Sequence, residues 1–152
     1  MEDIEIAKEL TIGLLERMGV QAEVEGFIRE GEFYFEIMGD QEGVLIGKDG
    51  RTLDSLQMLI NRMVNKKLKN ATRVVVDVDG YRKKRADSMV SLAQRMGAKA
   101  KRRGHSLIVG PFSAYDRRII HITLKEDHFL RTESLGEGEL KKVEIIPLKK
   151  EG

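Results

Sequence analysis

Two glycines separated by two residues, Gly47 and Gly50, stand among charged side chains and could hold a phosphate. Because glycine has no Cβ, another chain can approach its backbone closely. A helix is expected to begin just after Gly50, and its first N–H groups, which lack partners within the helix, would face the loop and attract an anion. Lys48 and Arg51 add positive charge. We therefore predict a site for a sugar-phosphate backbone made of Gly47, Lys48, Asp49, Gly50 and Arg51.

Asp49 places a negative charge inside this loop, where a phosphate is expected to lie. Lys48 offsets part of that charge, and Asp49 either points to solvent or weakens the phosphate contact. A glycine pair of this kind is also common in simple turns between helices, and this alternative stays open. A Walker loop is excluded, because three residues and not four separate Gly43 from Gly47, and Asp49 stands where a hydroxyl is required.

An arginine and a histidine, Arg117 and His121, lie four residues apart and therefore on one face of a predicted helix. Lys125 lies one turn further on, so a basic stripe is expected to project from this helix. Arginine binds phosphate through two N–H groups, and an imidazole ring donates a hydrogen bond or stacks on a base. We predict a second nucleic-acid site at Arg117 and His121, supported by Arg118 and Arg131. The alternative is a structural role, in which His121 orders Arg117 or a nearby backbone carbonyl.

No catalytic, metal or cofactor site is predicted. The three histidines, His105, His121 and His128, fit no common zinc spacing, and the chain has no cysteine. Ser113 and His121 could suggest a nucleophile and a base, but eight residues along one helix put them about 12 Å apart. We therefore expect a protein that is not an enzyme.

The first half of the chain must position the glycine loop. Apolar residues recur at helical spacing near the N-terminus, and alternation of apolar with polar residues then predicts a hairpin. A short helical turn capped by Asp40 precedes the loop, a longer amphipathic helix follows it, and a run of β-branched residues makes a third strand. The expected order is αββααβ, over residues 3–18, 21–28, 33–37, 40–46, 53–68 and 73–79.

The second half must position the arginine and the histidine. Gly80 breaks the pattern, and helical spacing then resumes in a long helix with basic residues crowded at both ends. Ser113 is expected to cap the helix that carries Arg117 and His121. The expected order is αβαββ, over residues 81–103, 107–109, 114–125, 130–135 and 142–148.

The net charge of +2 over 152 residues hides a strong asymmetry. Residues 1–46 carry a net charge of −9, residues 47–125 of +13 and residues 126–152 of −2. The middle segment contains the core of both predicted sites and suggests a polyanionic partner, although basic residues also decorate solvated helices. The acidic first segment suits a basic protein surface better than it suits RNA.

Composition excludes other classes of protein. Without cysteine there is no disulfide framework and no thiol nucleophile, which fits the reducing cytoplasm. No apolar run approaches the roughly 18 residues that span a bilayer, so no membrane insertion is expected. The acidic N-terminus lacks the basic start of a signal peptide.

The order of elements around the glycine loop, together with the stretch at residues 43–57, resembles a type II KH domain over residues 3–79. Such domains clamp about four nucleotides of a single strand. Residues 113–121 and 131–134 resemble the R-three-H domain, which is named for its Arg-x-x-x-His motif and is associated with single-stranded nucleic acid. That second likeness spans about residues 81–148.

A KH domain followed directly by an R-three-H domain is similar to the bacterial Jag family, also called KhpB. The resemblance implies an α+β fold, with a type II KH domain at residues 1–79 and an R-three-H domain at residues 80–152. It implies a non-catalytic protein of the cytoplasm that binds single-stranded RNA, with single-stranded DNA as another ligand. It further implies a bacterial post-transcriptional regulator or RNA chaperone linked to cell division and to envelope growth.

Family members commonly carry a further N-terminal Jag-N domain and a linker, whereas this chain starts at the first KH helix. We therefore expect a short member or a fragment and carry over no role of the Jag-N domain. The resemblance also implies a small single-KH-domain protein of the KhpA type as a partner, and a homodimer is a further expectation because KH domains pair with one another. A protein-interaction module with secondary RNA binding stands as the alternative function, and an enzyme as a third that no set of residues supports.

Overall fold

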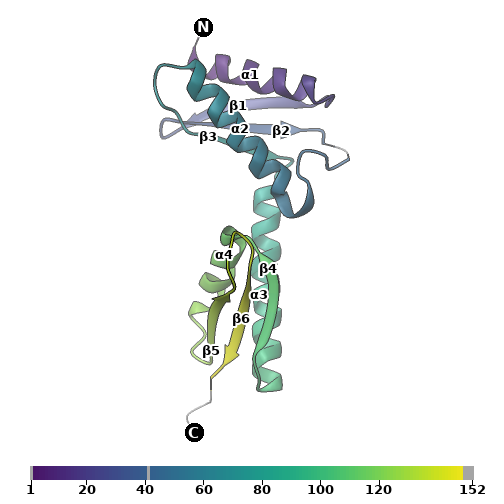
Figure 1. Cartoon of the computed structure of the whole chain (residues 1–152), viewed down its shortest axis with the longest axis vertical. Helices are drawn as coiled ribbons and strands as arrows, with labels where there is room; N and C mark the ends of the chain where they lie inside the picture. The colour runs from purple at the N-terminus through teal and green to yellow at the C-terminus, as the bar shows by residue number, and fades with distance from the viewer. Residues whose placement is uncertain (1, 41, 149–152) are drawn as a thin grey trace. The chain divides into compact units, whose positions relative to one another are not determined.

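The computed structural model describes residues 2–40 and 42–148 and divides between Arg82 and Lys83 into two compact units (Figure 1). Each unit has one three-stranded sheet with helices packed on it. The α+β class predicted from the sequence is confirmed. The outer limits of the predicted domains, residues 1 and 152, lie outside the described residues.

The elements follow the predicted order, with one exception before the glycine loop. The first unit contains α1 (Asp3–Arg17), β1 (Glu23–Arg29), β2 (Glu32–Met38), η1 (Lys48–Gly50), α2 (Arg51–Lys67) and β3 (Val74–Val78). The second contains most of α3 (Tyr81–Arg103), then β4 (Leu107–Phe112), α4 (Ala114–Lys125), β5 (Leu130–Leu135) and β6 (Lys141–Pro147). β4 runs past the predicted stop at Pro111, which an edge strand tolerates.

The exception is the short helix predicted before the glycine loop, where residues 42–46 form turns instead. The Asp40 carboxylate does accept the Leu45 N–H at 2.9 Å, and the Gly47 N–H donates to the Gly43 carbonyl at 3.0 Å. Positive φ angles of +67° at Gly43 and +70° at Gly47 depart from helical geometry. One turn therefore closes and does not propagate into a helix.

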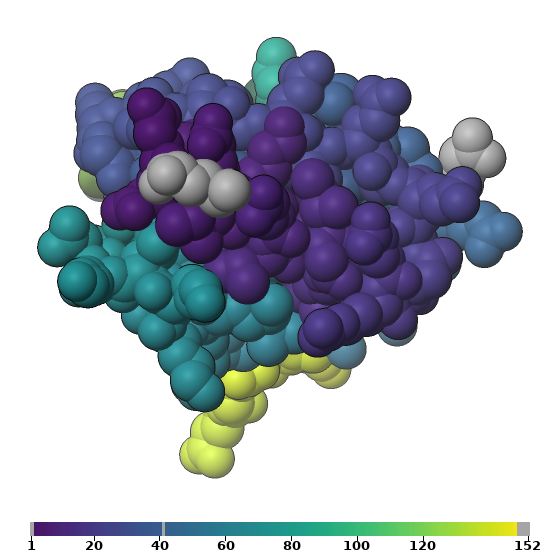
Figure 2. Space-filling model, turned by 90° about the horizontal axis from the view of Figure 1, so that it is seen from above, coloured from purple at the N-terminus to yellow at the C-terminus, as the bar shows by residue number. Residues whose placement is uncertain are grey.

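The first unit buries one face of its sheet. The strand order is β1-β2-β3, with β1 antiparallel and β3 parallel to β2. Alternation along β2 buries Phe33, Phe35 and Ile37 in the core to which α1 and α2 contribute. Figure 2 looks onto α1 (purple), beside which lie the β1–β2 hairpin (indigo) and the segment around the end of α2 (teal). The opposite face of the sheet keeps side chains such as Phe27 exposed.

The second unit packs α3 and α4 against an antiparallel sheet of order β4-β6-β5. Small residues on α3 allow close packing, since a Cβ at Gly97 would lie 2.9 Å from Cδ1 of Leu130. The predicted cap of α4 is confirmed, because Ser113 Oγ accepts the Asp116 N–H at 3.2 Å. α4, the helix that carries the Arg-x-x-x-His motif, packs against β5.

Candidate functional site

The glycines of the first predicted site are required by the fold itself. Gly47 has a φ of +70° and Gly50 of +79°, in the region that favours glycine. A Cβ at Gly47 would lie 2.7 Å from Cβ of Thr52, and a Cβ at Gly50 would lie 2.7 Å from Cε1 of Tyr81. The loop is therefore locked against the start of α2 and against the first turn of α3.

Three charged side chains of this loop reach solvent. Lys48, Asp49 and Arg51 are all exposed. Asp49 has a φ of +56°, a conformation that aspartate adopts more readily than most residues because its short side chain bonds locally. The loop thus presents two cations and one carboxylate on a backbone of fixed shape.

The N–H groups at the start of α2, which were predicted to lack partners within the chain, are already hydrogen-bonded there. The N–H groups of Thr52 and Leu53 both donate to the Ile46 carbonyl, at 3.1 and 3.2 Å. The Arg51 N–H donates to the Lys48 carbonyl. These donors close the turn of the protein itself, and the cations that remain exposed at this end of α2 are the Lys48 and Arg51 side chains.

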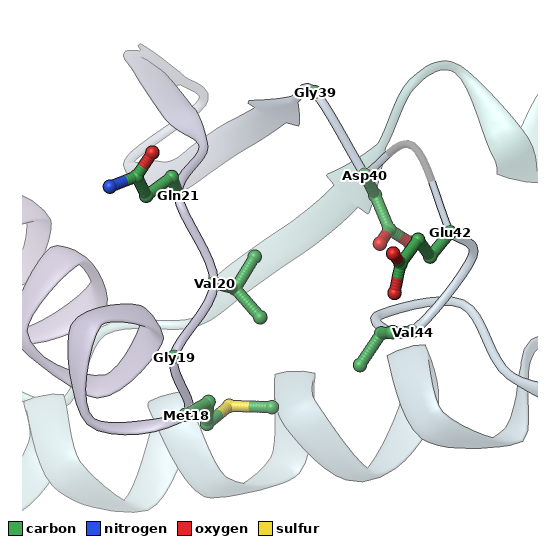
Figure 3. A pocket seen from close by; sticks show the side chains of 8 residues that line it. All are labelled: Met18, Gly19, Val20, Gln21, Gly39, Asp40, Glu42 and Val44. Atoms are coloured by element: carbon green, nitrogen blue, oxygen red, sulfur yellow. The ribbon is translucent and has the colours of Figure 1, made fainter.

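A hollow of about 520 Å³ lies beside the turns that lead into the loop (Figure 3). It is lined by Met18, Gly19, Val20, Gln21, Gly39, Asp40, Glu42 and Val44. In Figure 3 the apolar side chains of Met18, Val20 and Val44 point toward one another, with the two carboxylates beside them. Among the apolar side chains next to the glycine loop, Val44 is 49% exposed, whereas Leu45 and Leu53 are fully buried in the core.

The predicted basic stripe on α4 is wrong at its first member. Arg117 is only 9% exposed, and its Nη1 donates to the carbonyls of Phe112, at 2.6 Å, and Glu139, at 3.3 Å. An arginine side chain committed in this way joins the end of β4 to the β5–β6 connection. Arg117 therefore has a structural contact network where an exposed phosphate ligand was expected.

His121 lies between α4 and the neighbouring strand. Its Nδ1 lies 2.6 Å from Thr132 Oγ1, and its Nε2 lies 3.0 Å from Ser134 Oγ. Burial lowers the pKa of His121 below its ordinary value of 6.5, and the positive charge of Arg117 lowers this pKa further. The ring is therefore neutral near pH 7, with one nitrogen donating and the other accepting. It is oriented by two hydroxyls of β5, which differs from the predicted alternative of ordering Arg117 or a carbonyl.

A different row of side chains is exposed on α4. Tyr115 and Ile122 are each 59% exposed, and Arg118 and Lys125 are exposed as well. Spacings of three, four and three residues place them along one side of the helix, and we call them the α4 row: Tyr115, Arg118, Ile122 and Lys125. Ile122 and Lys125, together with His121, line part of a shallow hollow of about 400 Å³. The row combines apolar surface with two cations, and its spacing is visible in the sequence.

Arg131 lies on β5 and lines the same hollow as His121. The hydrogen bonds of His121 place Thr132 and Ser134 on the helix side of β5, so alternation directs the Arg131 side chain away from α4. Its Nη2 lies 3.5 Å from Oε1 of Glu133. Arg118 is thus the predicted cation that the structure keeps exposed on α4, and Arg131 borders the hollow beside that helix.

Basic residues at the start of α3 are also partly committed to internal contacts. Arg82 donates from Nε to the Val76 carbonyl at 2.9 Å and from Nη2 to Gln57 at 3.0 Å. Arg85 pairs with the buried Asp116 at 2.8 Å. Part of the positive charge of this end therefore serves packing within the chain.

Two further classes of site have no candidate in the part of the chain that the structure describes. No three His, Asp or Glu side chains there gather in a way that could hold a metal ion. No helix within residues 2–40 and 42–148 combines the length and the apolar character that crossing a membrane requires.

Comparison with known proteins gives the same division of the chain. Residues 5–78 match the KH-domain family described as KhpA/KhpB, and residues 87–147 match the R-three-H domain family. The RNA-binding protein KhpB of Clostridium symbiosum is 41% identical over 134 residues, which cover 88% of this chain and 60% of that protein. KhpB of Bacillus subtilis is 34% identical over 107 residues, covering 69% of this chain and 51% of that protein. This chain therefore spans 60% or less of the length of these relatives.

Proposed function

This chain belongs to the KhpB family, and on that premise we propose that it binds single-stranded RNA through two modules without catalysing a reaction. The observation that supports this proposal most directly is the α4 row beside the oriented His121 ring. Cations alternate there with an aromatic and an aliphatic side chain, which is the combination that attracts phosphates and stacks bases.

At the glycine loop, Lys48 and Arg51 contact successive phosphates, while Asp49 opposes one of these contacts. The adjoining base then enters the hollow that Val44 lines. The carboxylate of Glu42 in that hollow accepts hydrogen bonds from an exocyclic amino group, which adenine, cytosine and guanine carry and uracil lacks. The first module is thus proposed to combine phosphate attraction with a preference for amino-bearing bases.

At the second module, Arg118 and Lys125 contact phosphates, and Tyr115 and Ile122 pack against bases. The neutral His121 ring, oriented by β5, offers a flat surface and hydrogen-bonding nitrogens next to them. The buried Arg117 supports this surface by bridging backbone carbonyls. The RNA contact expected of Arg117 is therefore reassigned to Arg118.

The salt dependence of RNA affinity tests this function. Fluorescence anisotropy of a labelled single-stranded RNA should give a slope of log affinity against log salt near −3, because four phosphate contacts contribute about −0.7 each. The variant Lys48→Ala/Arg51→Ala should lose about half of that slope. A DNA strand of the same sequence tests the second ligand class. A wild-type affinity that does not change with salt contradicts the proposal.

A protein partner is the second candidate function, and an acidic row on the first sheet favours it. Glu25, Glu36 and Asp77 are cross-strand neighbours on the exposed face of that sheet. Burial raises the pKa of Glu36, and the neighbouring carboxylates raise it further. Such a row suits a basic protein surface, and a small single-KH protein of the KhpA type is the proposed partner. Light scattering of the mixture tests this, and two unchanged monomer masses contradict it.

The remaining expectations concern the role in a cell. We propose a post-transcriptional regulator or RNA chaperone of the cytoplasm, linked to cell division and envelope growth. Crosslinking of bound RNA in cells, followed by sequencing, tests this role. Transcripts of envelope and division proteins should be enriched, and a crosslinked pool that matches total RNA contradicts it.

A further inference from the structure

The basic residues of α3 in the second unit differ in how the fold uses them. Arg85 pairs with the buried Asp116 at 2.8 Å, and Lys101 pairs with Asp127 at 2.6 Å. Three other cations of this helix have neither an ion pair nor a side-chain hydrogen bond with any residue in 2–40 and 42–148: Arg95, Lys99 and Arg102. Their charge is therefore left for a ligand or for solvent.

These cations lie along the side of α3 that faces away from the core of the second unit. The buried residues of the helix recur at helical spacing and include Ala93 and Gly97. Spacings of four, four and three residues place a second set along the other side, and we call it the α3 row: Ser91, Arg95, Lys99 and Arg102. Lys99 is half-buried and the other three are exposed. The row extends about 16 Å along the helix, at 1.5 Å per residue.

The stability of the helix does not account for this row. Arg95 and Lys99 stand four residues apart, as do Lys99 and Arg103, and like charges at this spacing destabilise a helix. The negative end of the helix dipole attracts cations only in the last turn, so it favours Arg102 and Arg103 but not Arg95. Asp87 is the one acidic residue of α3, and it lies more than two turns before Arg95. The row is therefore a surface of uncompensated positive charge, which an anionic ligand would stabilise.

The α3 row has no side chain that stacks on a base, which distinguishes it from the α4 row. The α4 row contains Tyr115 and Ile122 beside its two cations. The α3 row consists of three cations and a hydroxyl, and the small residues Ser88 and Ala98 beside it leave room for a close backbone. Single strands are recognised largely by stacking on rings, whereas double-stranded RNA is recognised through its phosphates and 2′-hydroxyls. The composition of the α3 row therefore favours a double helix.

We propose that the α3 row binds the sugar-phosphate backbone of double-stranded RNA. The inference rests on the proposed function, to which it adds a second class of RNA structure. Arg95, Lys99 and Arg102 contact phosphates, and the Ser91 hydroxyl donates to a phosphate or accepts from a 2′-hydroxyl. A straight row of cations suits a duplex, because the phosphates of a duplex are held on a rigid helix at high charge density. The ligand of the second unit is then an RNA in which a helical stem adjoins a single strand.

Fluorescence anisotropy with a blunt RNA duplex of about 16 base pairs, and with an unstructured single strand of the same length, tests the α3 row. Arg95→Gln/Lys99→Gln should weaken duplex affinity about tenfold and reduce its salt slope by about 1.8, or 0.9 for each lost phosphate contact. Affinity for the single strand should fall less than about twofold. Lys66→Gln/Lys67→Gln removes the same charge at the exposed end of α2 and should keep the wild-type duplex affinity. The urea midpoint of the α3 variant should not fall, because a like-charge pair has been removed.

A gain of affinity provides a second test. Ala98→Lys adds a cation at an exposed position, three residues after Arg95 and four before Arg102. Duplex affinity should rise about threefold, and the salt slope should steepen by about 0.9. Glu9→Gln makes the same change of net charge at an exposed position of α1 and should leave duplex affinity unchanged.

Equal losses of duplex and single-strand affinity in Arg95→Gln/Lys99→Gln overturn the proposal, and so does a duplex affinity that neither α3 variant changes. Cosedimentation with phosphatidylglycerol vesicles covers an anionic membrane as the alternative ligand. Vesicle binding that this variant abolishes, at unchanged duplex affinity, also overturns the proposal. A wild-type chain that binds the single strand but not the duplex contradicts this inference alone, whereas a chain that binds neither RNA contradicts the proposed function as well.

Discussion

Arg117 Nη1 donates to the carbonyl oxygen of Phe112 at 2.6 Å, from a side chain that is almost entirely buried. The same nitrogen donates to the Glu139 carbonyl at 3.3 Å. The arginine of the Arg-x-x-x-His motif therefore ties the end of β4 to the connection between β5 and β6. Its first effect is on the stability of the unit that carries the α4 row.

Arg117→Ala should lower the free energy of unfolding by about 2 kcal/mol, because it removes charge-assisted hydrogen bonds and leaves buried carbonyls without donors. Arg118→Ala removes the same charge from an exposed position and should change stability by no more than about 0.5 kcal/mol. Urea denaturation measures both variants. Equal losses of stability would contradict the division of roles between these neighbours.

His121 predicts a pH dependence of stability. Its pKa in the folded chain is lowered below 6.5, chiefly by burial, so below that pH the unfolded chain binds more protons than the folded chain. The free energy of unfolding should therefore fall as the pH decreases from about 7 to about 5. His121→Gln keeps a donor and an acceptor but does not titrate, so urea denaturation should show a smaller fall. If the free energy of unfolding falls equally with pH in wild type and in His121→Gln, His121 is not the group responsible.

The ion pair between Arg85 and Asp116 should be important for packing α3 against α4. The carboxylate lies 2.8 Å from the guanidinium, and the Asp116 side chain is 5% exposed. Asp116→Asn leaves a partly buried cation without its carboxylate and should cost about 3 kcal/mol. Asp127→Asn breaks the more exposed pair with Lys101 and should cost less than about 1 kcal/mol. Thermal or urea unfolding distinguishes these, and a larger cost for Asp127→Asn would refute the ranking.

Asp49→Asn should strengthen RNA binding. The substitution removes the negative charge beside Lys48 and Arg51, and asparagine also tolerates the positive φ at this position. Affinity should rise about fivefold at low salt, because one unit charge at about 4 Å in water is worth about 1 kcal/mol. The gain should shrink at high salt. Anisotropy measures it, and an unchanged affinity would remove the glycine loop from the RNA site.

Local features of the first site were predictable from sequence, and its hydrogen bonds were not. Both glycines of the loop have positive φ angles, which other residues rarely adopt, so the residue type by itself indicates the turn. The N–H groups of Thr52 and Leu53 were expected to be free, because helix starts usually leave them so. They are taken by the Ile46 carbonyl, which the preceding turns bring into range. The spacing of residues in the sequence does not indicate that the turns before a helix bring a carbonyl back to its first N–H groups.

The Arg-x-x-x-His motif shows a different limit. A spacing of four correctly places Arg117 and His121 on one side of α4, but it does not say which side faces the core. Arg117 also lies three residues before Ile120 and seven before Leu124, both of which are buried. That relation places Arg117 on the apolar stripe, and it is the signal that would have predicted its burial.

The affinity of Arg118→Ala/Lys125→Ala for a labelled single-stranded RNA tests the central claim most directly. Lys66→Ala/Lys67→Ala removes the same two charges at the exposed end of α2 and is the matched control. We predict that the α4 variant binds about tenfold more weakly than wild type, a loss of about 1.4 kcal/mol, while the control stays close to wild type. Equal losses in both variants would contradict the account, because binding would then follow net charge and not the α4 row.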